Sequence, residues 1–327
     1  MFKALVLEAD SGEPRPVVRE LEDDALPAGD VTVAVAYSGL NFKDAMVLTN
    51  RGNLVRSYPH VPGIDLAGTV EASDHPDFQP GDEVLLNGWR VGEHHWGGLA
   101  GKARVRGEWL QHLPAGMSMQ HAMAVGTAGL AAMLGLLALE DHDLAPSAQV
   151  LVTGASGGVG SLATALAAAS GRYVTAVTGR PQNEIYLRGL GAHQVLDRSE
   201  LDGPPERPLE DQRWAGCIDP VGGQTLAHSL AQMRYGAAVA AVGLAGGAKL
   251  STTLLPFLLR GVSLLGIDSA ACPMERRRQA WQRLASDLSH DRLQSLFRVA
   301  SLAEVPELAN ELIQGSIRGR VVVDPGA

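Results

Sequence analysis

Hydrophobic and polar positions follow one rhythm up to about residue 115 of this chain and a different rhythm from residue 149 onward. The first part carries short β-prone runs, which turn signals such as Pro62-Gly63 and Pro80-Gly81-Asp82 separate from one another. We expect strands at residues 2–8, 31–38, 66–71, 83–86 and 103–105, and one helix at residues 41–48. This pattern predicts a β-rich first domain.

Strands and helices alternate in the second part. Expected strands lie at residues 149–153, 173–177, 194–196, 216–219, 237–242 and 263–267. Six such units with helices between them predict a doubly wound parallel sheet of the Rossmann type, and hence an α/β protein. Helical patterns follow at residues 274–288 and 302–313, and a β-prone run lies at residues 320–323. We therefore expect a catalytic domain over residues 1–121, a nucleotide domain over 122–268, and a segment over 269–327 that returns to the first domain.

One apolar stretch is long enough to raise the question of a membrane. Residues 122–139 carry no charge over 18 positions, which is the lower limit of a membrane span. The stretch contains three glycines and has no Lys or Arg at either end. We expect it to form a helix buried inside a soluble domain.

A glycine-rich turn follows the first strand of the second part. The apolar run 150–153 leads into Gly154, Gly157 and Gly160, and then into a helix of small residues. Glycines let the backbone approach a ligand closely, and the exposed amides at a helix start attract a pyrophosphate. The next strand ends in Thr178-Gly179-Arg180, where an NAD site would carry a carboxylate for the ribose hydroxyls. Arg180 can pair instead with a 2′-phosphate, so the sequence predicts NADPH as the cofactor.

The same residues also fit a hydrolase motif. Gly154 to Gly158 matches G-x-S-x-G, the turn that presents a nucleophilic serine, here Ser156. Candidate partners in the right chain order are Asp219 with His228, or Asp268 with His290. A hydrolase turn needs neither Gly160 nor Arg180, which favours the nucleotide interpretation. A P-loop is excluded because no Gly-Lys-Ser/Thr follows.

Composition narrows the class of protein. A length of 327 residues suggests two domains, and a net charge of −9 with 27 scattered basic residues argues against nucleic-acid or anionic-membrane partners. Cys217 and Cys272 are too few for a disulfide framework and show no zinc spacing. The apolar run at the start of the chain is too short for a secretion signal, so we expect a cytoplasmic location.

Further stretches carry a resemblance to a known family. They are LNFKDA at residues 40–45, PGIDLAGTV at 62–70, GEHHWGGL at 92–99, GTAG at 126–129, VTGASGGVG at 152–160 and AAVGLAGG at 240–247. With these stretches the chain resembles, over essentially its whole length, a zinc-free medium-chain dehydrogenase/reductase of the acryloyl-CoA reductase branch, often labelled putative quinone oxidoreductase. The resemblance implies a GroES-like catalytic domain, a Rossmann domain and a homodimer joined near residues 262–267.

The implied activity is NADPH-dependent reduction of the conjugated C=C bond of a small enoyl thioester, with acryloyl-CoA as the leading substrate. NADPH:quinone reduction, an NADPH-binding sensor or structural role, and serine hydrolysis are the alternatives. Zinc-using relatives place a Cys at the position of Asn41 and His-Glu at Ile64-Asp65, and their four-cysteine lobe is missing here, so no tetrahedral site can form. Without a Lewis acid, the acceptor must already be activated toward hydride.

The resemblance also implies site residues. The pyrophosphate would lie against Ser156, Gly157, Gly158 and Val159, and the 2′-phosphate against Thr178, Gly179 and Arg180. Further positions implied to line the cofactor are Arg198, Thr127, Leu244, Leu258, Ser269 and Gln314.

One position departs from the family pattern. The family's Asn-Tyr-Lys-Asp is Asn41-Phe42-Lys43-Asp44 here, so the phenolic hydroxyl is absent, although Phe42 can still stack on the nicotinamide. Asn41 is expected to donate to the substrate carbonyl, and Asp44 either to orient it or to cap the short helix. Cations that could meet the phosphates of CoA are Lys43, Arg51, Arg56, Arg90, Arg318 and Arg320.

Overall fold

The computed structural model describes residues 1–9 and 13–327. These residues form two compact units, Met1–Thr127 together with Leu293–Ala327, and Ala128–Arg292. The compact units change at residues 127/128 and 292/293, and the domains 1–121, 122–268 and 269–327 expected from the sequence stay a prediction. Each unit is described by itself below.

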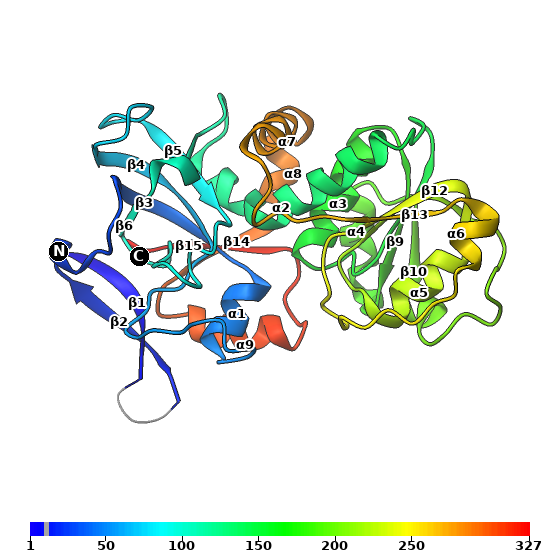
Figure 1. The fold of residues 1–327 in the computed structure, drawn as a ribbon, viewed down its shortest axis with the longest axis horizontal. Coiled ribbons are helices and arrows are strands. Elements are labelled where there is room, and N and C mark those ends of the chain that lie inside the picture. Colours follow the sequence, from blue (N-terminus) through cyan, green and yellow to red (C-terminus); the bar gives the residue numbers. More distant parts are fainter. Residues whose placement is uncertain (10–12) are drawn as a thin grey trace. The chain divides into compact units, whose positions relative to one another are not determined.

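The first unit contains a small hairpin and a larger sheet. Within the described residues the hairpin pairs β1 (Phe2–Glu8) with β2 (Arg15–Leu21), and the larger sheet has the order β14-β15-β3-β4-β5-β7, with β6 also paired to β3. The bounds are β3 Val31–Leu40, β4 Asp65–Ser73, β5 Glu83–Asn87, β6 Lys102–Val105, β7 Gln111–His112, β14 Phe297–Ser301 and β15 Arg320–Asp324. β15 pairs antiparallel with β3, so the last strand of the chain lies in the larger sheet beside a strand of residues 31–40 (Figure 1).

Two helices cover part of this sheet. α1 (Phe42–Leu48) and α9 (Val305–Ile313) lie side by side (Figure 1), although they are far apart in the sequence. Both contribute to a buried apolar cluster with β1, β3 and β15, whose members include Leu5, Leu40 and Val321. Short 3-10 turns lie at Asp23–Ala25 and Gly107–Trp109. Because α1 packs against α9, the segment that follows β3 is held in place.

The second unit is a parallel sheet with helices. Within its described residues the strand order is β10-β9-β8-β11-β12-β13, and each neighbouring pair is parallel. The bounds are β8 Gln149–Val152, β9 Tyr173–Thr178, β10 Gln194–Asp197, β11 Trp214–Asp219, β12 Met233–Ala241 and β13 Ser263–Gly266. This is the doubly wound order in which the first strand lies at the centre. The predicted α/β class, with a Rossmann sheet beside a β-rich GroES-like domain, is confirmed.

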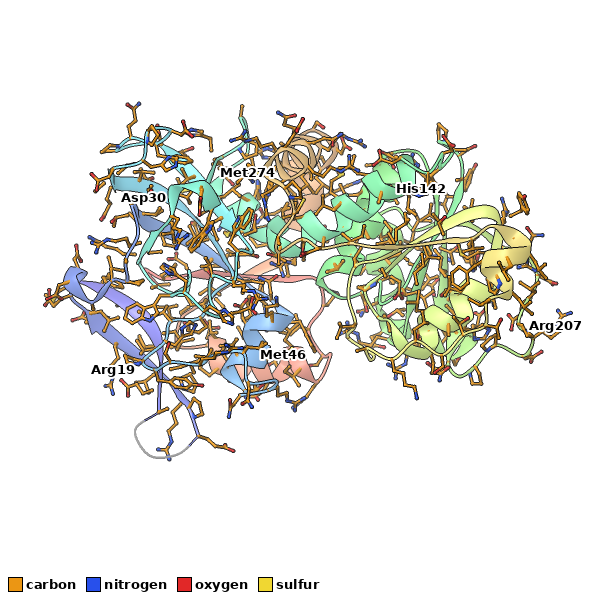
Figure 2. All side chains as sticks on the ribbon, in the orientation of Figure 1. Arg19, Asp30, Met46, His142, Arg207 and Met274 are labelled. Atoms are coloured by element: carbon orange, nitrogen blue, oxygen red, sulfur yellow. The ribbon has the colours of Figure 1, made fainter. Side chains whose placement is uncertain are left out.

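Helices α3 (Gly158–Ala169), α4 (Glu184–Gly189), α5 (Gly223–Ala231) and α6 (Leu255–Arg260) connect these strands, with 3-10 turns at Pro181–Asn183 and Arg198–Leu201. After β13 follow α7 (Met274–Asp287) and α8 (His290–Gln294), and the boundary between the units falls within α8. α3 packs on β8 and β9, and α6 packs on β12. Charged side chains such as Arg207, labelled in Figure 2, remain exposed on the surface.

The long apolar helix is α2 (Met119–Glu140). Of its most apolar 18-residue window, 89% is buried inside the protein, which confirms the expectation of a core helix. The helix is interrupted at Gly126, whose φ of 50° and ψ of −156° are not helical. Such a conformation is essentially restricted to glycine, and the interruption frees the backbone of the following residue for other partners.

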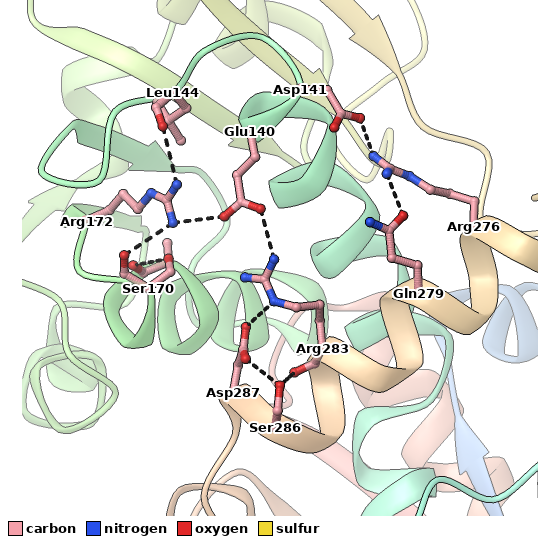
Figure 3. A network of polar contacts seen from close by, with 11 residues as sticks. Glu140, Asp141, Leu144, Ser170, Arg172, Arg276, Gln279, Arg283, Ser286 and Asp287 are labelled. Atoms are coloured by element: carbon pink, nitrogen blue, oxygen red, sulfur yellow. Dashed lines mark hydrogen bonds and ion pairs between the residues drawn. The ribbon is translucent and has the colours of Figure 1, made fainter.

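A polar network holds the C-terminal end of α2 within the second unit (Figure 3). Glu140 accepts from Arg172 at 2.9 Å through one carboxylate oxygen and from Arg283 at 3.0 Å through the other. Arg283 also pairs with Asp287 on α7 at 2.8 Å. One carboxylate therefore joins the end of α2, the residue before β9 and helix α7.

Candidate functional site

The glycine-rich turn after β8 forms the start of α3. Gly154 has a φ of +53°, and a Cβ on Gly160 would lie only 2.3 Å from the carbonyl oxygen of Gly154. Glycine is therefore required at Gly154 by the turn and at Gly160 by the close packing of helix against turn. Gly157, Gly158 and Val159 are partly exposed, so the first amides of α3 can meet an anion.

Hydrogen bonds of three residues join this turn to the end of β9. The hydroxyls of Ser156 and Thr178 are 2.9 Å apart. Arg180 Nη2 donates to Ser156 Oγ at 2.9 Å and to its carbonyl oxygen at 3.3 Å, and the Arg180 backbone N–H donates to Thr178 Oγ1 at 3.1 Å. The structure thus brings the glycine turn and the predicted phosphate-binding cation together.

A second cation lies beside the same segment. A Cβ on Gly179 would be 2.7 Å from both Cδ and Nε of Arg198. Arg198 starts the 3-10 turn after β10, and its side chain is largely exposed, 4.0 Å from Asp202. Gly179 therefore allows the Arg198 side chain to lie across the backbone at the carboxyl end of β9. Arg180 and Arg198 flank this glycine, an arrangement suited to a dianionic phosphate.

The remaining predicted positions of the second unit lie on other segments. Leu244, after β12, is 61% exposed, and Leu258, on α6, is 73% exposed. Ser269 lies after β13, where its carbonyl oxygen accepts from Arg277 at 3.0 Å. Their predicted contact with a cofactor stays a proposal.

The hydrolase interpretation of Ser156 does not survive the geometry. Ser156 bonds to Thr178 and Arg180, whereas His228 bonds to Glu210 at 3.2 Å and Asp219 accepts from Thr153 at 2.5 Å. A nucleophilic serine needs a base within hydrogen-bond reach. The Ser156, His228 and Asp219 side chains are thus committed to separate contacts, and Asp268 accepts from the backbone of Ala270.

A second polar group lies in the first unit, where β3 leads into α1. Asp44 is fully buried and accepts from the backbone N–H of Asn41 and of Ile64, each at 2.9 Å. Burial, together with repulsion from the nearby Asp65 carboxylate, raises the pKa of Asp44 to about 7. Of the two roles considered for Asp44, the contacts support the cap of α1.

The side-chain amide of Asn41 forms hydrogen bonds within the protein. Its Nδ2 donates to the Gly39 carbonyl at 3.1 Å and to Asp65 at 2.8 Å, while its Oδ1 accepts from Arg320 at 3.1 Å. Both amide hydrogens are thereby used. We therefore propose that Asn41 positions the start of α1, in place of the donor role expected from the sequence.

Asp65, which sequence reasoning had considered only as a position without zinc ligands, is the centre of this group. It has no exposed surface and accepts from Asn41, from Asn87 at 2.7 Å, and from Thr127 through both its backbone N–H at 2.8 Å and its hydroxyl at 2.5 Å. Arg320 lies 3.7 Å from it. The only signal in the sequence was an aspartate that follows an apolar turn and opens a strand.

The expected CoA-binding cations are partly corrected. Arg320 is 4% exposed and donates to the carbonyl oxygens of Leu40 and Ala124, so the expectation that it meets a CoA phosphate is wrong. Lys43 pairs with Glu93 at 3.1 Å. Arg51, Arg56, Arg90 and Arg318 are exposed.

Three other predicted residues of this unit reach the surface. Phe42 is 40% exposed, so part of its ring is accessible to a ligand. Gln314 is exposed at the end of α9. Thr127 is partly exposed, next to the interruption in α2.

Metal-ligating side chains do not gather in the part of the chain that the structure describes. No group of three or more His, Cys, Asp and Glu residues there could hold a metal ion. His95 Nε2 contacts the Arg104 carbonyl oxygen at 2.7 Å, and its ring lies edge-on to Trp109. His95 is thereby part of the local packing.

Known proteins are similar to this chain over its whole length. Residues 27–130 match the model of the alcohol dehydrogenase GroES-like domain, and residues 158–286 match the model of the zinc-binding dehydrogenase. The acrylyl-CoA reductase AcuI of Ruegeria pomeroyi is 55% identical over 100% of both chains. The putative quinone oxidoreductase YhfP of Bacillus subtilis is 43% identical over 99% of this chain and 98% of its own.

A solved structure is similar to the same extent. The yhdH oxidoreductase from Salmonella enterica in complex with NADP superposes with a TM-score of 0.96 at 51% identity, covering 98% of this chain and 99% of that chain.

Proposed function

The chain belongs to the medium-chain dehydrogenase/reductase family, in its acrylyl-CoA reductase branch, and from this membership we propose that it reduces the conjugated C=C bond of acryloyl-CoA to propanoyl-CoA with NADPH. One observation in the chain itself carries the cofactor assignment. Arg180, bonded to Ser156 and Thr178 and joined by Arg198 across Gly179, places two cations where β9 ends.

These residues fit NADPH by their chemistry. The partly exposed amides of Gly158 and Val159 at the start of α3 suit a pyrophosphate, and the two guanidinium groups suit the 2′-phosphate. A dinucleotide without this phosphate offers no dianion for these two guanidinium groups to contact. Bound NADPH supplies the hydride for the reduction.

The side chains of the protein are proposed to bind the cofactor and the substrate and to orient them. Phe42, which directly follows Asn41, is 40% exposed, and Asp44 accepts from the Asn41 N–H at the start of the helix that Phe42 opens. A C=C bond conjugated to a thioester already accepts hydride at its β-carbon, so no Lewis acid is required. The work of the protein is then to hold donor and acceptor in contact and to exclude water.

A catalytic zinc ion does not fit these residues, although one of the matching family models carries zinc in its name. The Asn41 amide is engaged by Asp65 and Arg320, and a guanidinium would repel a divalent cation at this place. No step of the proposed reaction therefore involves a metal ion.

We further propose that two copies pair through β13, the last strand of its sheet. Large apolar side chains near this edge are exposed, namely Tyr235, Leu254, Leu258, Leu259 and Leu264. An open edge flanked by apolar surface favours association with a second chain. Light scattering is expected to give the mass of a dimer, and Leu264→Lys to shift it toward the monomer, whereas a monomeric wild type would contradict the pairing.

The proposed location is the cytoplasm. Among the described residues both cysteines, Cys217 and Cys272, are free and buried. Unpaired thiols are typical of reducing compartments.

Steady-state assays test the activity. NADPH oxidation is measured with acryloyl-CoA and with 1,4-benzoquinone, and propanoyl-CoA is identified by mass spectrometry. We expect kcat/KM to be higher for acryloyl-CoA. Preferential turnover of the quinone would favour the alternative that the name of the Bacillus subtilis relative suggests, and tight NADPH binding without turnover of any acceptor would favour a sensor.

A further inference from the structure

We propose that Asp65 and Arg320 are positioning residues that make the hydroxyl of Thr127 an obligate hydrogen-bond acceptor for the carboxamide N–H of a nicotinamide ring. The proposal rests on the proposed use of NADPH and adds residues whose action is indirect. It is carried by a chain of hydrogen bonds whose direction is fixed at one end.

Arg320 fixes that direction. A guanidinium can only donate, and Arg320 donates through Nη1 to the Asn41 Oδ1 at 3.1 Å and to the Leu40 carbonyl at 3.0 Å. The Asn41 amide must therefore turn its oxygen toward Arg320 and its Nδ2 toward Asp65. The orientation of this amide is thus determined by its partners.

The hydrogen bonds to Asp65 also have a fixed direction, because its carboxylate accepts them. Its Oδ2 accepts from Asn41 Nδ2 and from the backbone N–H of Thr127, each at 2.8 Å, and both are groups that can only donate here. Its Oδ1 accepts from Asn87 Nδ2 at 2.7 Å. With Arg320 3.7 Å away, the carboxylate is surrounded by donors and a positive charge. The remaining partner, the Thr127 hydroxyl at 2.5 Å, therefore donates its proton to Asp65.

A threonine hydroxyl has one proton and two lone pairs. Because the Thr127 proton points to Asp65, the hydroxyl oxygen of this partly exposed residue can offer only lone pairs to a ligand. It will accept from an N–H and will not donate to a carbonyl oxygen. Asn41, which shares Asp65 with Thr127, is followed directly by the exposed Phe42. An exposed aromatic residue that follows this hydrogen-bonded group, together with a hydroxyl that can only accept, suits a ring that bears a primary carboxamide.

The backbone is shaped to admit this arrangement. A Cβ on Gly126 would lie 2.4 Å from Asp65 Oδ2 and 2.8 Å from Arg320 Nη2, and a Cβ on Gly39 would lie 3.1 Å from atoms of the same two side chains. The interruption of α2 at Gly126 also presents the Thr127 N–H to Asp65. Two glycines thus make room for the Asp65–Arg320 pair, and the pair holds Thr127.

The test compares two reduced cofactors. NADPH carries a carboxamide, and its 3-acetylpyridine analogue has a methyl group where the carboxamide has its NH2. Dissociation constants for both are measured by fluorescence titration, with 2′,5′-ADP as a ligand that lacks the ring. Wild type and Thr127→Ser are expected to prefer NADPH by about 2- to 10-fold, the range of one neutral hydrogen bond.

The variants separate positioning from general damage. Thr127→Val is expected to remove the preference, and Asp65→Asn to reduce or reverse it because the freed hydroxyl can then donate to the acetyl oxygen. Ser38→Ala removes a buried hydrogen bond of 2.7 Å to the Asp65 backbone carbonyl and is expected to keep the preference. Affinity for 2′,5′-ADP is expected to stay the same in all of them.

An unchanged preference in Thr127→Val, or an equal loss of 2′,5′-ADP affinity, would overturn the proposal. Should Asp65→Asn fail to fold, the Val and Ser variants of Thr127 still decide the question. These are binding measurements, so a wild type that prefers NADPH but does not reduce acryloyl-CoA would refute the proposed activity and leave this inference standing. A wild type that does not bind NADPH would refute both.

Discussion

Replacing Arg180 tests the cofactor assignment most directly. In the structure Arg180 Nη2 donates to the hydroxyl of Ser156 at 2.9 Å, and that hydroxyl also contacts Thr178. Arg180→Ala removes the guanidinium from the edge where the 2′-phosphate is proposed to lie. Only NADPH carries this phosphate, so NADH measures everything else that the substitution changes.

The expected magnitude follows from the contacts. A hydrogen bond to a charged group contributes about 1.5–3 kcal/mol, which corresponds to about 10- to 150-fold in affinity. Arg180→Ala should raise the Kd of NADPH by this factor. It also removes the bonds that Arg180 makes to Ser156, but this loss affects both cofactors alike. The ratio of the two Kd values therefore isolates the phosphate contact.

Isothermal titration calorimetry provides the assay. Wild type and Arg180→Ala are titrated with NADPH and NADH at one ionic strength, because exposed charge pairs weaken with salt. Arg188→Ala is the matched control, since this arginine forms an exposed pair with Glu184 and a contact with the His193 carbonyl on the same unit. Arg198→Ala should have a smaller effect than Arg180→Ala, because its side chain is 69% exposed.

Equal losses for NADPH and NADH in Arg180→Ala would refute the reasoning. The guanidinium would then serve to hold the glycine turn rather than to select the cofactor. A large effect of Arg188→Ala would show that the assay reports general damage.

Three further predictions concern stability. Gly126→Ala should lower the free energy of unfolding by at least about 3 kcal/mol in denaturant titrations, because its Cβ would displace a buried ion pair, whereas Gly81→Ala, with a φ of +97° and open space, should cost only backbone strain of about 1–3 kcal/mol. The pKa of Asp44 is raised from 3.8 to about 7, so between these values the folded state holds a proton that the unfolded state has lost. The free energy of unfolding should therefore fall as the pH rises from about 4 to 7, by at most about 4 kcal/mol. The variant Asp44→Asn should not show this fall. Glu140→Ala leaves the buried Arg172 without its counter-charge and should cost about 1–3 kcal/mol; a thermal scan showing no change would contradict the role of that network.

The fold could be predicted from the sequence where local signals agree. All six strands of the parallel sheet overlap their predicted ranges, because buried parallel strands are continuous apolar runs and glycine turns separate them from helices. Strands β2, β7 and β14 were not predicted. β2 is largely exposed and β7 has two residues, so neither has a hydrophobic pattern that identifies it.

The residues of the glycine-rich turn could likewise be predicted from the sequence. Ser156 lies in the turn after β8, Thr178 ends β9 and Arg180 follows it, and these two consecutive strands are parallel neighbours. The carboxyl ends of neighbouring strands meet at one edge, so their proximity follows once the strands are known. The residues in the first unit offered no such rule, since the order of antiparallel strands does not follow from their positions in the chain.

The sequence by itself determined the alternation of strands and helices, the sites of the glycine turns and the charge at the end of β9, because each of these depends on neighbours within a few residues. Only the tertiary structure decided what Asn41, Asp65 and Arg320 do. They come from β15 at the end of the chain and from the segments around β3 and β4, and they meet because β15 pairs with β3 and β3 pairs with β4. A buried charge is stable only with its partners in place, and those partners are set by packing across the sheet, which no local pattern encodes.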